Sequence, residues 1–264
     1  MTIETILAIG AGVRAAPGNL LPGSGDSFTL RAPVSGSDIY LVDVLLDIAN
    51  ASNFELRSPR MHDNVSGLRF DIFTPTVCFS ALRGIKQPMF GQDNLQFIGG
   101  IGGGAATYDL MAASIYYESL IGSPGNFYHW DNIMNSIKNL LTIKIVPVGS
   151  FTGDWDAGVA LNSTNDLLKA NTNYAILGAL CVGTAGIVGF QGQFTGNVRL
   201  GVPIYSSSVS FNSSYLVDLS RNSGLATIPV FSSADKAGVF VYTASQSGIT
   251  NSIDILCAEL EGSL

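Results

Sequence analysis

The chain has 264 residues, which is enough for one large domain or two ordinary ones. Hydrophobic residues make up 47% of it and charged residues only 12%, against about 25% in an average soluble domain, so its surface is unusually neutral. The net charge is −7, with 13 lysines and arginines and no basic run. This excludes the phosphate-neutralising patch that direct nucleic-acid binding requires, and we expect other subunits to cover part of the neutral surface.

Residues 1–25 are apolar at first and then rich in glycine, proline and asparagine. We expect them to form an N-terminal arm that docks onto a neighbour, rather than an element of the core. Glu4 stands where a secretion signal is basic, so no signal peptide is predicted.

A first β-rich unit is expected over residues 26–121. The run 39–48 is long and apolar enough for a strand that is buried on both faces. Shorter alternating segments, separated by turn residues, predict further strands. They lie at 54–57, 68–73, 95–98 and 110–117. Thr74 and Pro75 supply the N-cap and the first-turn proline of one short helix.

A linker that contains a helix is expected over residues 122–141. It opens with Gly-Ser-Pro-Gly, which is typical of a domain boundary. Apolar residues then recur with the 3.6-residue period of one helix face. These residues are Ile133, Met134, Ile137, Leu140 and Leu141. The second unit is expected to begin at Thr142, with a short helix that ends at Gly224.

Two segments about 130 residues apart resemble each other, which indicates a tandem repeat. Residues 40–73 and 174–203 both open with a tyrosine and an apolar run, and both include a turn followed by an apolar residue and an arginine. Each is followed by a glycine that can end a helix, Gly84 or Gly224, and then by Pro-x-Phe. The alternative is that β-rich segments of similar composition imitate each other.

The predicted fold class is all-β: two tandem antiparallel β-sandwiches with a few short helices. Each unit has about eight short strands and no long helices between them, which favours the jelly roll over an open α/β sheet. The predicted organisation is therefore a double jelly roll. Its parts are an N-terminal arm at 1–25, a first unit at 26–121, a linker and helix at 122–141, and a second unit at 142–264.

Patterns that would support catalysis are incomplete. Gly100, Gly102 and Ala105 match the spacing of a dinucleotide fingerprint, but no βαβ unit surrounds them. His62 and His129 have no cysteine or second histidine at metal-binding spacing, and no nucleophile motif accompanies them. We therefore predict no catalytic residue, no cofactor and no metal site, and we expect that the protein is not an enzyme.

Other conspicuous residues also have structural explanations. Asp154 and Asp156 could contact Ca²⁺, but the EF-hand spacing is absent, which favours a turn. Cys78, Cys181 and Cys257 lie in apolar runs without C-x-x-C spacing and are expected to be buried thiols. Residues 174–190 are uncharged and approach the length of a membrane span, but four glycines weaken a helix there and favour buried strands.

Taken together, the duplicated β units with one short helix each, the linker, the arm and the low charge resemble viral capsid proteins of the double jelly-roll type. The strings RSPRMHDNVSGLR at 57–69 and NDLLKANTNYAILG at 165–178 also look similar to structural proteins of environmental phages. The resemblance implies a phage structural protein that builds an icosahedral capsid as a pseudo-hexameric trimer. It further implies synthesis in the host cytoplasm, a final place in the virion, and contacts with further copies, other virion proteins and an internal membrane.

Charged residues concentrated in two otherwise neutral loops, 57–69 and 195–199, are candidate subunit contacts. The candidate residues are Arg57, Arg60, His62, Asp63, Asn64, Arg69, Asn197 and Arg199. Two alternatives remain open. One is a virion decoration, tail or adhesin-type β-sandwich protein that binds carbohydrate or a capsid surface. The other is an enzyme on a bicupin-like double barrel, which would need clustered metal-binding histidines that two unmatched histidines do not supply.

Overall fold

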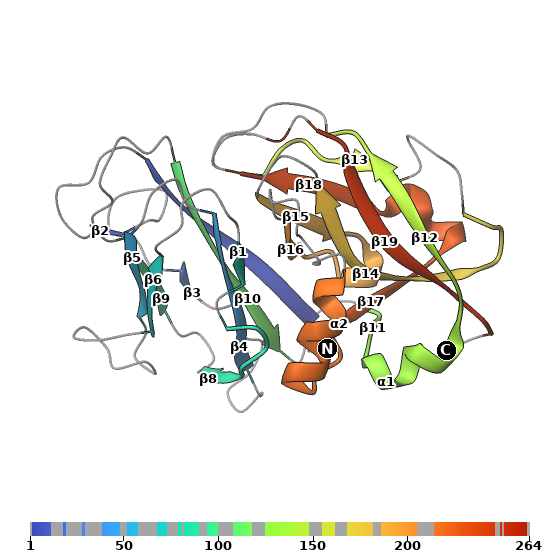
Figure 1. The fold of residues 1–264 in the computed structure, drawn as a ribbon, viewed down its shortest axis with the longest axis horizontal. Helices are drawn as coiled ribbons and strands as arrows, with labels where there is room; N and C mark the ends of the chain where they lie inside the picture. Colours follow the sequence, from blue (N-terminus) through green and yellow to red (C-terminus); the bar gives the residue numbers. More distant parts are fainter. Residues whose placement is uncertain are drawn as a thin grey trace.

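The computed structural model describes most residues of the chain. The described residues are 2–11, 18–19, 28–29, 39–47, 52–57, 68–72, 79–80, 82–89, 94–99, 108–117, 125–147, 155–161, 168–181, 186–204, 214–245, 249 and 251–262. They fold mostly into antiparallel β-sheets with a few short helices, as the sequence predicts (Figure 1).

The strands of the first half are β1 (Thr2–Ala11), β2 (Gly18–Asn19), β3 (Phe28–Thr29), β4 (Ile39–Asp47), β5 (Ser52–Arg57), β6 (Leu68–Ile72), β7 (Phe79–Ser80), β8 (Gln87–Met89), β9 (Asn94–Gly99) and β10 (Tyr108–Tyr117). Those of the second half are β11 (Phe127–Tyr128), β12 (Ile137–Ile145), β13 (Val159–Ala160), β14 (Asn173–Cys181), β15 (Gly186–Gln191), β16 (Leu200–Ile204), β17 (Ile228–Ser232), β18 (Phe240–Ala244) and β19 (Ile253–Leu260). The helices are α1 (Trp130–Ile133) and α2 (Tyr215–Ser223), with 3₁₀ turns η1 (Met134–Ser136), η3 (Gln193–Thr195) and η5 (Ser233–Gly238).

The two halves have the same order of strand pairing. In the first half, one sheet runs β1-β10-β4 with β7 and β8 both beside β4, and the other has β2 and β3 beside β9, then β5 and β6. In the second half, one sheet runs β12-β19-β14-β17, with β11 beyond β17, and the other runs β13-β18-β15-β16. If the strands of each half are numbered one to eight along the chain, with β2/β3 and β7/β8 sharing one position each and the two-residue β11 left out, both halves read 1-8-3-6 and 2-7-4-5. Each half is thus a two-sheet, sandwich-like unit.

A β-bulge lies at the same place in both halves. The register between β4 and β10 skips Val42, and the register between β14 and β19 skips Leu177. Such a bulge fixes the local register, so it aligns the two halves residue by residue. The row beside the bulge consists of Thr5, Ser114 and Asp43 in the first half, and of Thr142, Leu256 and Gly178 in the second.

One hydrophobic core extends through the second half and into the first. Its largest fully buried side chains include Tyr174, Phe190 and Phe231. Strand β4 is buried along nearly its whole length, because one of its faces lies inside its own sandwich and the other packs against the second half. This confirms the prediction of a strand buried on both faces.

The first strand of each half differs from the sequence-based expectation. Residues 2–11, predicted as part of an arm, form β1, which pairs with β10 along its full length. Residues 137–145, predicted as the end of a helix and the start of the second unit, form β12, so the expected boundary at residue 142 falls inside a strand. The helix is confined to α1 and η1. The apolar spacing of Leu140, Leu141 and Ile143 is compatible with a helix or with a strand, and pairing with β19 stabilises the strand.

The other predicted elements are found close to their expected places. Helix α2 ends at Gly224, which has φ +66°, and the left-handed conformation expected of Gly84 is also present, with φ +85°. The apolar stretch at 174–190 contains strands β14 and β15. In the part of the chain that the structure describes, no helix has both the length and the apolarity to cross a membrane. The short helix predicted from Thr74 to about Arg83 is not found in its described part, because Phe79–Ser80 form β7 and residues 82–84 form a turn. Residues 74–78 and the glycine-rich stretch at 100–107 lie outside the described residues.

Candidate functional site

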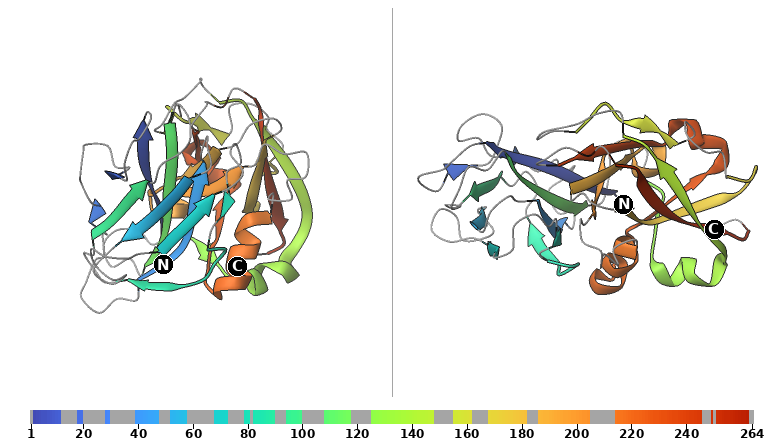
Figure 2. Two further views of the ribbon diagram at one scale, coloured as in Figure 1. Left: turned by 60° about the vertical axis from the view of Figure 1, so that its left-hand side comes forward. Right: turned by 45° about the horizontal axis from the view of Figure 1, so that its top comes forward.

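The two halves pack face to face. The face of β1-β10-β4 that points away from its own sandwich lies against the corresponding outer face of β13-β18-β15-β16, with contacts from β1 and β10 to β16 and from β4 to β15. In Figure 1 the four sheets therefore follow one another from left to right, and the right-hand view of Figure 2 shows the halves side by side along the long axis. We call this contact the joint; the residues that define it below are Thr5, Asp43, Arg199, Gly201 and Tyr215.

Thr5 of β1 forms the polar contact between the facing sheets. Its backbone N–H donates to the carbonyl of Arg199 at 2.7 Å, and its Oγ1 accepts from the N–H of Gly201 at 2.7 Å. Its hydroxyl also lies 3.0 Å from that of Ser114 on β10. A Cβ on Gly201 would lie 2.6 Å from Cγ2 of Thr5, so only glycine allows β16 to approach β1 this closely.

Asp43 of β4 is a fully buried carboxylate in the joint. Its Oδ2 accepts from the hydroxyl of Tyr215 on α2 at 2.7 Å and from the hydroxyl of Ser80. Its Oδ1 accepts from the backbone N–H groups of Val44 at 2.7 Å, Leu82 at 3.0 Å and Arg83 at 3.3 Å. Burial raises the pKa of Asp43 above its ordinary value, and these hydrogen bonds oppose that effect. One side chain thus connects β4, the turn after β7 and a helix of the other half.

The turn after β7 rests on α2. Gly84 takes φ +85°, and a Cβ there would lie 2.9 Å from Cβ of Asn222. The side-chain amide of Asn222 donates to the carbonyl of Arg83 at 2.9 Å. The glycine predicted from the repeat therefore has a second role, because it lets the turn approach the helix of the other half.

Arg199 lies inside the joint rather than in a free loop. Its guanidinium is stacked over the rings of Tyr242 at 4.4 Å and Trp155 at 5.6 Å, and its side chain is partly buried. Asn197, the other candidate of that loop, is exposed, has φ +61°, and accepts from the amide of Gln191 through its carbonyl at 2.8 Å. Arg199 thus contacts the first half through its backbone carbonyl, which accepts from Thr5, whereas its side chain stacks on rings of its own half.

Of the candidate contact residues in the first half, two lie in described strands and four lie outside the described residues. Arg57 ends β5 opposite Gln96 of β9, and Arg69 lies in β6 opposite Glu55. The remaining candidates lie outside the described residues. They are Arg60, His62, Asp63 and Asn64.

Asp156, Cys181 and Cys257 occupy positions with a structural role. The carboxylate of Asp156 accepts from the N–H groups of Gly158 and Thr243, each at 3.0 Å, and from the hydroxyl of Thr243 at 2.7 Å, which fits the predicted turn. Cys181 and Cys257 are buried, and burial raises the pKa of the Cys257 thiol to about 12. Within the described ranges, no group of three histidines, cysteines or carboxylates is placed to hold a metal ion.

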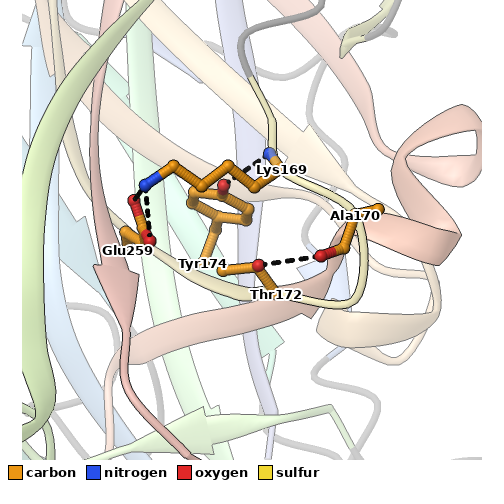
Figure 3. Close-up of polar contacts among 5 residues, drawn as sticks. All are labelled: Lys169, Ala170, Thr172, Tyr174 and Glu259. Atoms are coloured by element: carbon orange, nitrogen blue, oxygen red, sulfur yellow. Dashed lines mark hydrogen bonds and ion pairs between the residues drawn. The ribbon is translucent and has the colours of Figure 1, made fainter.

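A second polar cluster anchors the segment before β14 (Figure 3). The ammonium group of Lys169 lies 2.6 Å and 2.8 Å from the two carboxylate oxygens of Glu259 on β19. The hydroxyl of Tyr174 accepts from the backbone N–H of Lys169 at 2.8 Å. Glu259 is buried whereas Lys169 is largely exposed, so the pair closes one end of the second sandwich.

A pocket of about 490 Å³ opens beside β17, η3 and η5. Asn126, Asn173 and Asp235 contribute polar groups to its lining, and Phe194 and Phe231 lie in its wall. Both phenyl rings are buried in the core, so they offer little surface to a ligand.

Comparison with known proteins gives no family. No protein-family model matches the chain, and no curated protein matches it. One similar solved structure is the crystal structure of the PBSX exported protein XepA, with 9% sequence identity, covering 97% of this chain and 86% of that chain. Its TM-score is 0.31, which does not define a shared fold.

Proposed function

We propose that the chain is a double jelly-roll structural protein of a phage virion, which builds an icosahedral capsid as a pseudo-hexameric trimer. The observation that carries the proposal is the strand order 1-8-3-6 and 2-7-4-5, present in both halves. Eight antiparallel strands in two such sheets are the jelly-roll arrangement, which occurs in viral capsid and lectin domains. The common order and the common bulge also support a duplicated ancestral unit.

The joint supports a mechanical role. A capsid subunit that consists of two sandwiches needs a fixed angle between them. In this chain an apolar interface, the Thr5 contacts and the buried Asp43 all connect the two halves at the joint. Interfaces of this kind do not slide freely, because any displacement would leave buried donors without acceptors. The chain is thus proposed to act as one block with the footprint of two units.

The surface composition supports self-association. With 12% charged residues, the chain lacks the dense charge that keeps most soluble proteins apart. The proposed partners are further copies of the chain, other virion proteins and an internal membrane, and the proposed place is the virion, after synthesis in the host cytoplasm. In this proposal the protein acts through contact surfaces, without catalysis, cofactor, metal or direct nucleic-acid contact.

Electron microscopy of the purified protein, combined with sedimentation over a range of concentrations, tests the proposal. Trimers, flat hexagonal sheets or closed shells would support it. A protein that stays monomeric at every concentration, and is missing from purified virions, would contradict it.

Loop variants refine this test. We expect Arg60→Ala combined with Asp63→Ala to weaken assembly while far-UV circular dichroism of the monomer is unchanged. Unaltered assembly would remove these two residues from the interface without affecting the proposal as a whole.

A virion decoration, tail or adhesin-type protein is the second candidate, and the pocket beside β17 is the observation that favours it. Glycan-array binding that Asn126→Ala and Asp235→Ala abolish would identify it. The pocket is lined by polar side chains, which include Asn126, Asn173, Gln193, Ser232 and Asp235, but its two phenyl rings are buried, which is why the structural role is the first choice.

A further inference from the structure

We propose that copies of this chain associate head to tail through two specific faces. One is the outer face of β12-β19-β14-β17, and the other is the outer face of β2-β9-β5-β6 on the next copy. The inference rests on the proposed function, and it specifies which surface of one copy meets which surface of another.

The first step is the asymmetry of the joint. Inside the chain, the outer face of one half's 1-8-3-6 sheet packs on the outer face of the other half's 2-7-4-5 sheet. A contact between similar units that uses two different faces is heterologous. Each half therefore keeps the face that its neighbour uses: the second half keeps its 1-8-3-6 face, and the first half keeps its 2-7-4-5 face. These two faces lie at opposite ends of the stack of sheets (Figure 1).

The second step compares residues at equivalent register positions. Ile3 and Thr5 of β1 correspond to Leu140 and Thr142 of β12. Ile3 is 0% exposed and Thr5 is 4% exposed, because the second half covers them. Leu140 is 54% exposed, and Thr142 is also exposed. At these two positions of the first long strand, the surface that is buried in the first half is thus exposed in the second.

The open face combines an apolar part with one pair of opposite charges, because Lys144 and Asp254 lie opposite each other in the row of Leu180. Leu140 is joined along β12 by Val146, which follows the strand and is 52% exposed. Leu256 and Leu180 lie on the same face of the neighbouring strands and are half-buried. In the described part of its sheet, β12 is also the outermost strand, and such an edge readily accepts a partner.

The third step identifies the opposite face. The pair Glu55 and Arg69 is the fourth pair of the ladder between strands four and five, counted from Ser52 and Ile72, as Gly189 and Gly201 are the fourth pair counted from Gly186 and Ile204. Gly201 is the position that meets Thr5 across the joint. By the same register, Thr142 of one copy should meet Arg69 of the next. Arg69 was selected from the sequence as a contact residue, and register gives it a specific partner.

Disulfide trapping tests this pairing. Cβ of Thr5 lies 3.0 Å from a Cβ built on Gly201, so an equivalent pair needs to separate by only about 0.5 Å to reach the 3.5–4.5 Å range of a disulfide. In the full chain carrying both Thr142→Cys and Arg69→Cys, mild oxidation with copper-phenanthroline should convert most chains into disulfide-linked multimers, with a trimer as the largest species if the ring closes at three copies. An equimolar mixture of the two single variants should give dimers only. The wild-type chain and a Thr142→Cys, Ile85→Cys control should give none, because Ile85 belongs to neither sheet.

The outcomes separate this inference from the proposed function. Cross-linking of Thr142→Cys alone would indicate a symmetric contact and would overturn the head-to-tail pairing. No cross-link in the double variant, while electron microscopy still shows assembled particles, would overturn the inference and leave the structural role intact. A strictly monomeric chain would overturn both. A second, independent measurement is sedimentation of Leu140→Asp against Ile85→Asp, where only the former should reduce assembly, by at least about tenfold in association constant.

Discussion

Strands β1 and β12 occupy the same position in their sheets, but the outer face of β1 is buried and that of β12 is exposed. Each is the first long strand of its half, each pairs with the last strand of that half, and each carries a threonine in the row beside the bulge. The second half covers β1, whereas β12 faces solvent on its outer side. The difference shows that burial of a strand here depends on what packs against its sheet more than on its own sequence.

Removing the carboxylate from the joint should have the largest effect on this comparison. Asp43→Ala leaves two hydroxyls and three backbone N–H groups without their acceptor in a buried site. We expect it to lower the free energy of unfolding by about 3–5 kcal/mol, as measured by urea denaturation.

Asn at the same position is the matched control. Asp43→Asn keeps an acceptor for the backbone N–H groups and presents an amide to the two hydroxyls, which can accept as well as donate. Asp43→Asn should therefore lower the free energy of unfolding far less than Asp43→Ala does. Equal losses in the two variants would show that the polar contacts do not stabilise the joint.

The equivalent residues Ile3 and Leu140 allow a direct test of the comparison. Ile3→Ala removes a fully buried side chain and should cost about 2–4 kcal/mol. Leu140→Ala acts on a side chain that is 54% exposed and should cost about 0.5 kcal/mol or less in the dilute monomer. Thermal unfolding at low protein concentration measures both, and equal losses would contradict the assignment of β12 as an open strand.

A side chain at Gly201 should strain the joint without removing any polar group. Gly201→Val places a Cβ 2.6 Å from Thr5 and should cost about 1–3 kcal/mol, because β16 and β1 must separate. Gly238→Ala is the matched control, since a Cβ there meets nothing within 4 Å. Chemical denaturation of both variants would show a selective loss at Gly201 if the close approach is structural.

The pH dependence of stability should give the smallest effect. The pKa of Asp43 is raised in the folded protein, so the carboxyl binds its proton more tightly there than in the unfolded chain, where the value is near 3.8. Its contribution is fully present below about pH 3.8 and is lost as pH rises through the folded pKa. Relative to Asp43→Asn, the wild-type free energy of unfolding should fall over this range by at most about 1.4 kcal/mol per pH unit. A difference that is flat or rises with pH would contradict the raised pKa.

The sequence predicts the repeated strands well but misses β1, and it assigns the first residues of β12, 137–141, to a helix. The long apolar run of β4 and the alternation in β5 and β6 are local signals. By contrast, β1 is paired with residues more than 90 positions away, and β12 has apolar spacing that also suits a helix. Propensity alone cannot decide such cases, because the long-range partner determines the outcome.

The sequence predicts the residues of the joint only in part. Arg199 was selected as a contact residue, and its contacts are within the chain. Asp43 lies in the apolar run 39–48 and is not among the candidate residues, although a carboxylate inside a predicted buried strand requires partners. Its main partner, Tyr215, is 172 positions away, and no local pattern connects the two.

Pairing of the first with the last strand of each half has an evolutionary consequence. Thr2 lies opposite Tyr117, and Ile137 lies opposite Leu260, so the chain enters and leaves each sandwich at the same edge. A gene segment that encodes such a unit can be appended to another without threading one fold through the other. The same geometry means that a third copy, or a foreign domain inserted at residues 118–124, should be accommodated at the seam without rebuilding either sandwich.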